Sequence, residues 1–265
     1  MCYAVALYKN VKCNFYILHV AGLKDLPVDA ARMFPIPTDL KDQTKLDKKT
    51  LLDNFLSKAC HHFENEKHGF YAQLEHGGLI EAVQKQLSEK RIDLIVMGTT
   101  GIDKLKKKVM GSNTGAMITR VRCNTLVVPK HAKFKPLQRI TFPTDFNIFY
   151  TPKVLKDLSE ILDVSSAKLS VLHVSGSQMD FTDGQKTNKD YLFDYLEEVF
   201  PKKYNFSIIH DKKIINAIQD FVRENNIGMI SMIGRNLNFL QQLFFDSKVE
   251  TMSFHTMVPM MVIHE

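Results

Sequence analysis

The sequence has 265 residues, of which 45% are hydrophobic, enough apolar material for a globular core in one large or two small domains. No apolar run is long enough to cross a membrane, and the first residues lack the basic leader and cleavage site of a secretory signal. The formal net charge of +6 comes without a nucleic-acid-binding motif or aromatic residues interleaved among the lysines, so we expect no nucleic-acid partner and no membrane.

The cysteines are scattered along the chain and form no CxxC motif. This pattern is typical of a reducing, cytoplasmic compartment and argues against a disulfide framework or a cysteine-based zinc site. The run Cys60-His61-His62 has no i, i+4 histidine pair, so we expect no metal site there either. The four cysteines are Cys2, Cys13, Cys60 and Cys123.

The first half of the chain alternates strand-like and helix-like segments. An apolar strand, NFYILHV, ends at Val20 and leads into a proline-bearing loop that we expect to reach residue 44. A helix over residues 51–63 follows. A short strand, an amphipathic helix and the apolar strand LIVMG come next, and a glycine-containing loop leads to a helical stretch. The strand NTLVVP, residues 124–129, closes this half.

The second half repeats this pattern. Residues 206–234 align with residues 70–98 without a gap, and KLSVLHV ends at Val174 as NFYILHV ends at Val20. Strands alternating with helices predict parallel sheets with right-handed crossovers. The sequence therefore predicts two tandem doubly wound α/β domains, at residues 1–131 and 132–265, joined by the linker PKHAKFKP.

The two halves do not begin alike. The second starts with RITFPTDFN, a strand and a turn, before its first helix, whereas Met1 aligns opposite Leu155 within that helix. The first domain thus lacks a counterpart to this strand, which is central in a doubly wound sheet. We expect that Met1 is not the ancestral start, and that the closing strands TLVVP and MMVIHE pair the two halves.

The loop MGTTGIDKLKKKVMGSNT, residues 97–114, has several features of a phosphate-binding site. It follows a strand and precedes a helix, whose free backbone N–H groups and positive dipole end favour an anion. Glycine allows the backbone to approach a ligand closely. The lysine-rich middle is expected to be a solvated face. His19 and His173, at matched strand ends, either line such a cleft or hold backbone partners. The predicted ligand contacts are Val20, Gly98, Thr99, Gly101, Gly111, Ser112, Asn113 and Thr114.

Together, PTDF after a first strand, LHV on the second and G-x2-G-x9-G-S after the fourth resemble the universal stress protein family. The resemblance covers nearly the whole chain and implies five-stranded parallel sheets. It also implies binding of ATP or AMP in members that keep this glycine pattern, and pairing of domains through the closing strand.

The second copy of the loop departs from that pattern. Only Gly234 survives, because Leu237 stands opposite Gly101 and Ser247 opposite Gly111. Asp145 of PTDF is kept there, and in the family that aspartate lies at the adenosine end of the pocket. The first copy keeps the loop and Val20 but lacks the aspartate. We therefore expect nucleotide in the first domain alone.

Three functions compete. The first is a cytosolic stress-response regulatory protein that binds an adenine nucleotide and is not an enzyme. The second is an interaction module that binds no nucleotide and contacts a protein or apolar ligand through its second half, with a homodimer also open. An enzyme ranks third, because neither a G-x-S-x-G elbow nor a Walker pattern is present, although slow ATP hydrolysis is compatible with the sequence.

Overall fold

The computed structural model describes residues 1–21, 38–99, 112–176, 181–235 and 258–265. The chain divides into two compact units, each described here by itself. The smaller unit is Tyr8–Ile92, and the larger consists of Met1–Leu7 and Asp93–Glu265. The predicted boundary at residues 131 and 132 falls inside the larger unit, and the division into two family-type domains stays a prediction.

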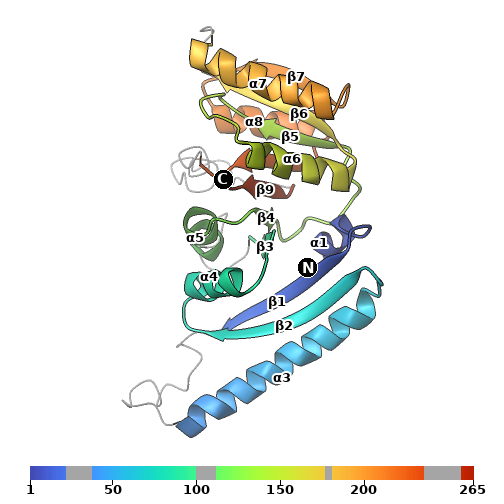
Figure 1. Ribbon diagram of the computed structural model, residues 1–265, viewed down its shortest axis with the longest axis vertical. Coiled ribbons are helices and arrows are strands. Elements are labelled where there is room, and N and C mark those ends of the chain that lie inside the picture. The colour runs from blue at the N-terminus through green and yellow to red at the C-terminus, as the bar shows by residue number, and fades with distance from the viewer. Residues whose placement is uncertain (22–37, 100–111, 177–180, 236–257) are drawn as a thin grey trace. The chain divides into compact units, whose positions relative to one another are not determined.

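The smaller unit is built on a two-stranded parallel sheet of β1 (Cys13–Ala21) and β2 (His68–His76). The long helix α3 (Thr38–His62) lies along this pair (Figure 1), and α4 (Leu79–Glu89) follows β2. Phe15 and Phe70 stack across the two strands, with ring centroids 5.3 Å apart, and Phe63 adds a third ring from the end of α3. Aromatic pairs of this kind hold the small sheet together.

The larger unit contains a seven-stranded sheet in the order β3-β4-β9-β8-β5-β6-β7 (Figure 1). Neighbouring strands are parallel within β3-β4 and within β9-β8-β5-β6-β7, and the two groups meet in the antiparallel pair β4–β9. The strands are β3 (Ile95–Gly98), β4 (Thr125–Val128), β5 (Arg139–Pro143), β6 (Lys168–Ser175), β7 (Tyr204–His210), β8 (Met229–Ile233) and β9 (Met260–Ile263).

Helices cover both faces of the second-half part of this sheet. In the view of Figure 1, α6 (Pro152–Ser165) and α7 (Asp183–Val199) lie in front of the strands, and α8 (Ile214–Glu224) lies behind them. Ser159 on α6 and Tyr195 on α7 share a hydrogen bond of 2.7 Å, which fixes these two helices side by side. An α/β fold dominated by parallel strands was predicted from the sequence and is confirmed. The remaining helices of this unit are α1 (Cys2–Leu7) and α5 (Ser112–Arg120).

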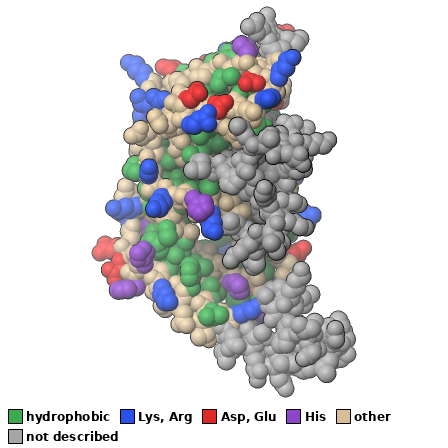
Figure 2. All heavy atoms as spheres, turned by 180° about the vertical axis from the view of Figure 1, so that it is seen from behind, with side chains coloured by type: hydrophobic (Ala, Val, Ile, Leu, Met, Phe, Trp, Pro, Cys, Tyr) green, Lys and Arg blue, Asp and Glu red, His purple; other side chains and the backbone are tan. Residues whose placement is uncertain are grey.

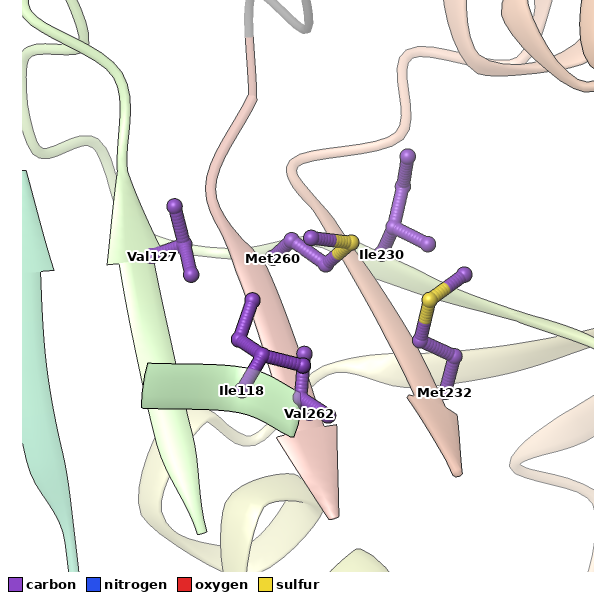
Figure 3. Close-up of a cluster of buried hydrophobic side chains, with 6 residues drawn as sticks. All are labelled: Ile118, Val127, Ile230, Met232, Met260 and Val262. Atoms are coloured by element: carbon purple, nitrogen blue, oxygen red, sulfur yellow. The ribbon is translucent and has the colours of Figure 1, made fainter. Parts of the chain in front are cut away.

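The predicted pairing of the two closing strands is also confirmed. Thr125, Leu126 and Val127 of β4 lie opposite Val262, Met261 and Met260 of β9 in antiparallel register. One face of this junction is a buried apolar cluster to which α5 contributes Ile118 and α8 adds partly buried side chains (Figure 3). The buried members are Ile118, Val127, Ile230, Met232, Met260 and Val262. Burial of this cluster stabilises the joint between strands from the two halves of the chain.

Two loops are shorter than the sequence suggested: the loop before α3, and the loop before α7, for which the sequence predicts residues 175–190. Helix α3 begins at Thr38, directly after Pro37, whereas we expected loop up to residue 44. Helix α7 begins at Asp183, because Thr182 and Gln185 form a capping box: the Thr182 hydroxyl accepts from the Gln185 backbone N–H, and the Gln185 side chain accepts from the Thr182 N–H. The capping signal T-x-x-Q was present in the sequence and was missed.

Candidate functional site

The candidate site starts where β3 ends. Gly98 is the last residue of β3, and Thr99 follows it in a bend, with its backbone N–H donating to the Val128 carbonyl at 3.3 Å. Residues 100–111 are outside the described part of the chain, so Gly101, Gly111 and the lysines between them remain sequence predictions. The end of a parallel strand is where doubly wound sheets place their ligands.

Helix α5 returns to this strand end. The Thr114 hydroxyl, on the first turn of α5, donates a hydrogen bond of 3.0 Å to the Gly98 carbonyl oxygen. Thr114 is only 2% exposed, whereas Asn113 beside it is exposed. Because the Thr114 proton is used in this contact, its hydroxyl positions the start of α5 against β3 and offers no proton to a ligand at the same time. Helix α5 begins at Ser112, so Ser112, Asn113 and Thr114 lie in its first turn and not, as expected, in the loop before it.

Gly98 has room around it. A β-carbon at this position would meet nothing closer than the Val128 carbonyl oxygen, at 4.0 Å. The described surroundings therefore give no steric reason for a glycine at the end of β3.

Val20, the other predicted contact, belongs to the smaller unit. It is half-buried near the end of β1, opposite Glu75 of β2. The Glu75 carboxylate accepts hydrogen bonds from the side chains of Lys85 and Gln86, at 3.0 and 2.7 Å. The hydrogen bond from Lys85 is the main reason that the pKa of Glu75 lies below its ordinary value, and the carboxylate is therefore charged at neutral pH.

In the second half, the residues that follow β5 pack against side chains of the same half. The Asp145 carboxylate accepts 3.0 Å hydrogen bonds from the backbone N–H and the side-chain amide of Asn147. Phe146 is fully buried with a φ of +58°, and its ring stacks on His173 at 5.6 Å between centroids. A bulky residue in this left-handed region carries strain, which the ring's burial offsets.

Phe181 adds further contacts to the stacked rings of Phe146 and His173. Phe181 meets both Phe146 and His173 edge-on, at 5.5 and 4.8 Å between centroids, and the Lys189 ammonium lies 5.4 Å from the Phe181 ring. The ring of His173 donates from Nδ1 to the Thr144 carbonyl at 2.9 Å, which is the backbone partner considered from the sequence. The His173 side chain is thereby held within the aromatic cluster.

A cavity of about 20 Å³ lies beside these residues, enough for about one water molecule. An adenine nucleotide does not fit in such a volume. The lining residues are Phe142, Pro143, Thr144, Asp145, Ile148, Met232 and Ile233.

The titratable groups give no sign of an activated nucleophile in the part of the chain that the structure describes. Burial, followed by the charge of Asp93, raises the pKa of the Cys123 thiol to about 11, and so disfavours the thiolate. Burial also raises the pKa of the Tyr150 phenol well above its usual range. Among the described residues, no group of three or more His, Cys, Asp or Glu side chains could hold a metal ion.

The face shown in Figure 2 and the helices of the described ranges bear on a basic surface and on a membrane span. Figure 2 shows Lys and Arg side chains dispersed over one face among residues of other kinds. The visible described part of that face therefore has no single basic patch. A search of the helices in those ranges finds none that is both long and apolar enough to span a bilayer.

Comparison with known proteins identifies the family. The family model "Universal stress protein family" matches residues 1–129, which include β1 to β4 and the whole glycine loop. Over these residues the chain matches the universal stress protein family, as its motifs predicted. No curated protein matches the sequence.

Solved structures agree on the fold. A universal stress protein from Archaeoglobus fulgidus DSM 4304 superposes with a TM-score of 0.63 at 16% identity, over 95% of this chain and 87% of that one. A putative universal stress protein from Pseudomonas aeruginosa UCBPP-PA14 gives a TM-score of 0.52 at 11% identity, with coverages of 97% and 94%. A protein of unknown function from Pseudomonas aeruginosa PAO1 gives a TM-score of 0.51 at 10% identity, over 98% of this chain and 94% of that one. At these identities the likeness concerns the fold alone.

Proposed function

We propose that this chain is a cytosolic stress-response regulatory protein, not an enzyme, that binds one adenine nucleotide, ATP or AMP, through the loop of residues 98–114. The observation that carries the proposal is the contact between Thr114 and Gly98, which holds the start of α5 against the carboxyl end of β3. The N–H groups of the first helical turn then face the strand end, where a phosphate would be stabilised.

Two further observations support this assignment. The family match spans the whole loop. The resemblance described above associates the glycine spacing of this loop with ATP binding. The steric freedom at Gly98 leaves space for a close approach to the backbone. In contrast, the second copy of the loop keeps only Gly234 of the glycine pattern, so the proposal assigns nucleotide to the first half alone.

The test is native mass spectrometry of the purified chain, with released small molecules identified. We expect one adenine nucleotide per chain, bound either as purified or after ATP or AMP is added. Gly111→Val should abolish binding, because its side chain would occupy the predicted phosphate position. The matched control is Ser247→Val, at the position opposite Gly111 in the second loop, and it should leave binding unchanged.

An empty wild-type chain that ignores added ATP and AMP would overturn the proposal. The second candidate function, an interaction module that binds no nucleotide, would then take its place. The closed aromatic cluster around Phe146 favours that role for the second half, and exposed Phe149 and Tyr191, stacked at 5.2 Å, offer it an apolar surface.

A further inference from the structure

One edge of β1 carries a row of backbone groups without a strand partner. The backbone N–H of Cys13 donates to Lys67 and the carbonyl of Ala21 accepts from Gly77, at 2.9 and 3.1 Å, so the odd-numbered residues of β1 face β2. In a strand, alternate residues direct their N–H and C=O to opposite sides. The even-numbered residues therefore face the other edge, where the described chain supplies no neighbouring strand. They are Asn14, Tyr16, Leu18 and Val20.

The second half shows what this edge is built to pair with. Its strand β6 lies between β7 and β5 and is parallel to both. The N–H of Lys168 donates to Gln138 and the carbonyl of Leu172 accepts from Thr144, both at 2.9 Å, so the even-numbered residues of β6 face β5. Alignment of Val20 with Val174 places the even-numbered residues of β1 opposite those of β6. The open edge of β1 is thus equivalent to the edge that β5 occupies.

The burial of the side chains on β1 and β6 agrees with an open edge on β1. Residues 169–173 of β6 are all buried, whereas the aligned residues 15–19 of β1 are half-buried, with His19 exposed. Residues 14–20 contain no Pro, Lys or Arg of the kind that protects exposed edges from pairing. An apolar, unprotected edge of this length is a template for strand addition, in which main-chain hydrogen bonds provide affinity and alternate side chains provide specificity.

We propose that the edge of β1 formed by Asn14, Tyr16, Leu18 and Val20 is a docking site for an extended strand of another polypeptide, parallel to β1 and apolar on both faces. The chemistry of the partner follows from β5, where Ile140, Thr141 and Phe142 are all at most 1% exposed. A strand that resembles RITFP therefore fits this edge. The proposal does not rest on nucleotide binding, although Val20 is also one of the ligand contacts predicted from the sequence.

The test uses a labelled peptide of residues 138–146, QRITFPTDF, and the full-length chain, with binding measured by fluorescence anisotropy. We expect saturable binding of one peptide per chain. Leu18→Pro removes an N–H in the middle of the open edge without removing a bond to β2, and should weaken binding by about tenfold or more.

The matched control variant is Ile208→Pro on the outer edge of β7. The Asp211 N–H donates to Ser175, and Lys203 accepts from Leu169, so odd-numbered residues of β7 face β6 and Ile208 faces outward. Its replacement tests a proline on an exposed edge strand away from the proposed site. Peptide affinity should remain that of the wild type.

Peptide variants make the test independent of how the protein variants fold. In β5, Thr144 donates to Leu172 and Gln138 accepts from Lys168, so even-numbered residues of the peptide are expected to face β1. N-methylation of Ile140 and Phe142 should abolish binding, whereas N-methylation of Arg139 and Thr141 should preserve it.

Three results would overturn the proposal: no saturable binding, equal loss in the Leu18→Pro and Ile208→Pro chains, or indifference to the position of N-methylation. Sedimentation supplies a fourth. Self-association of the wild-type chain that Leu18→Pro abolishes would assign the edge to a second copy of this chain and not to a different polypeptide.

Discussion

The hydroxyl of Thr114 on α5 donates a hydrogen bond to the carbonyl of Gly98 at the end of β3, across the whole length of the glycine loop. Thr114→Val keeps the shape of the side chain and removes this bond. We expect the free energy of unfolding to fall by about 1 kcal/mol and nucleotide affinity to fall with it, because the start of α5 is no longer fixed to the strand. Urea titration and calorimetric binding measure the two effects.

Thr119→Val is the matched control for this change. Thr119 is also on α5, and its hydroxyl donates to the Gly115 carbonyl at 2.9 Å, but the side chain is exposed and the bond stays within the helix. The free energy of unfolding of the Thr119→Val chain should change by less than about 0.5 kcal/mol. Equal effects of the two substitutions would show that the Thr114 contact has no special role.

Two buried serines on the large sheet should respond in opposite directions to alanine. Ser231 is 0% exposed and its hydroxyl has no hydrogen-bond partner among the described residues, whereas the Ser170 hydroxyl donates to Asn205 at 2.8 Å. Ser231→Ala removes an unsatisfied polar atom and should raise the free energy of unfolding by about 1 kcal/mol. Ser170→Ala should lower it by a similar amount. Destabilisation by Ser231→Ala would contradict this account.

Stability should fall at mildly acidic pH in part because of His264. Burial first, then the cations Lys153 and Arg122, lower the pKa of this imidazole from its ordinary value of 6.5. The unfolded chain therefore binds a proton more readily than the folded chain. The contribution of neutral His264 to the free energy of unfolding is fully present above pH 6.5, and it is lost as the pH falls through the lowered pKa of the folded state.

Substitution of His264 tests this pH dependence. In His264→Asn, the free energy of unfolding should fall less steeply than in the wild type between about pH 7.5 and about pH 5. Parallel slopes for the wild type and His264→Asn would rule out a contribution from this group.

The β4–β9 junction should be sensitive to lost volume. Met260 is 1% exposed within the cluster of Figure 3, and Met260→Ala should cost about 2–5 kcal/mol, the usual range for such a truncation in a core. Val199→Ala, at the 42% exposed end of α7, should change stability by less than about 0.5 kcal/mol. Thermal unfolding of both variants measures this difference, and similar melting temperatures of the two variants would contradict the packing role of the junction.

Much of the fold could be predicted from the sequence because the signals involved are local. Apolar runs identified the buried strands β6 and β8, helical spacing identified α4 and α8, and the internal repeat related one half to the other. The closing strands were predicted to pair and do so as β4 and β9. The family resemblance and the position of the glycine loop between β3 and α5 also followed from motifs alone.

Other features depend on contacts between distant residues, and the tertiary structure decided them. In the second half, Val171 of β6 lies opposite Phe206 of β7. The alignment of the two copies therefore predicts that Ile17 of β1 lies opposite Phe70 of β2. In the structure, Phe15 lies opposite Phe70 instead. A shift of two residues keeps every side chain on its face, so the periodicity of the sequence does not distinguish the two registers.

The same holds for the site. The buried position of Thr114 and the closure of the second-half site around Phe146 arise from packing between elements that no local pattern encodes. The separate sheet of β1 and β2 has a similar origin, because strand partners are chosen by hydrogen bonds across the fold. The sequence by itself determined which segments are strands and helices and which loop resembles a phosphate site, and the tertiary structure decided which backbone edges and side chains remain available.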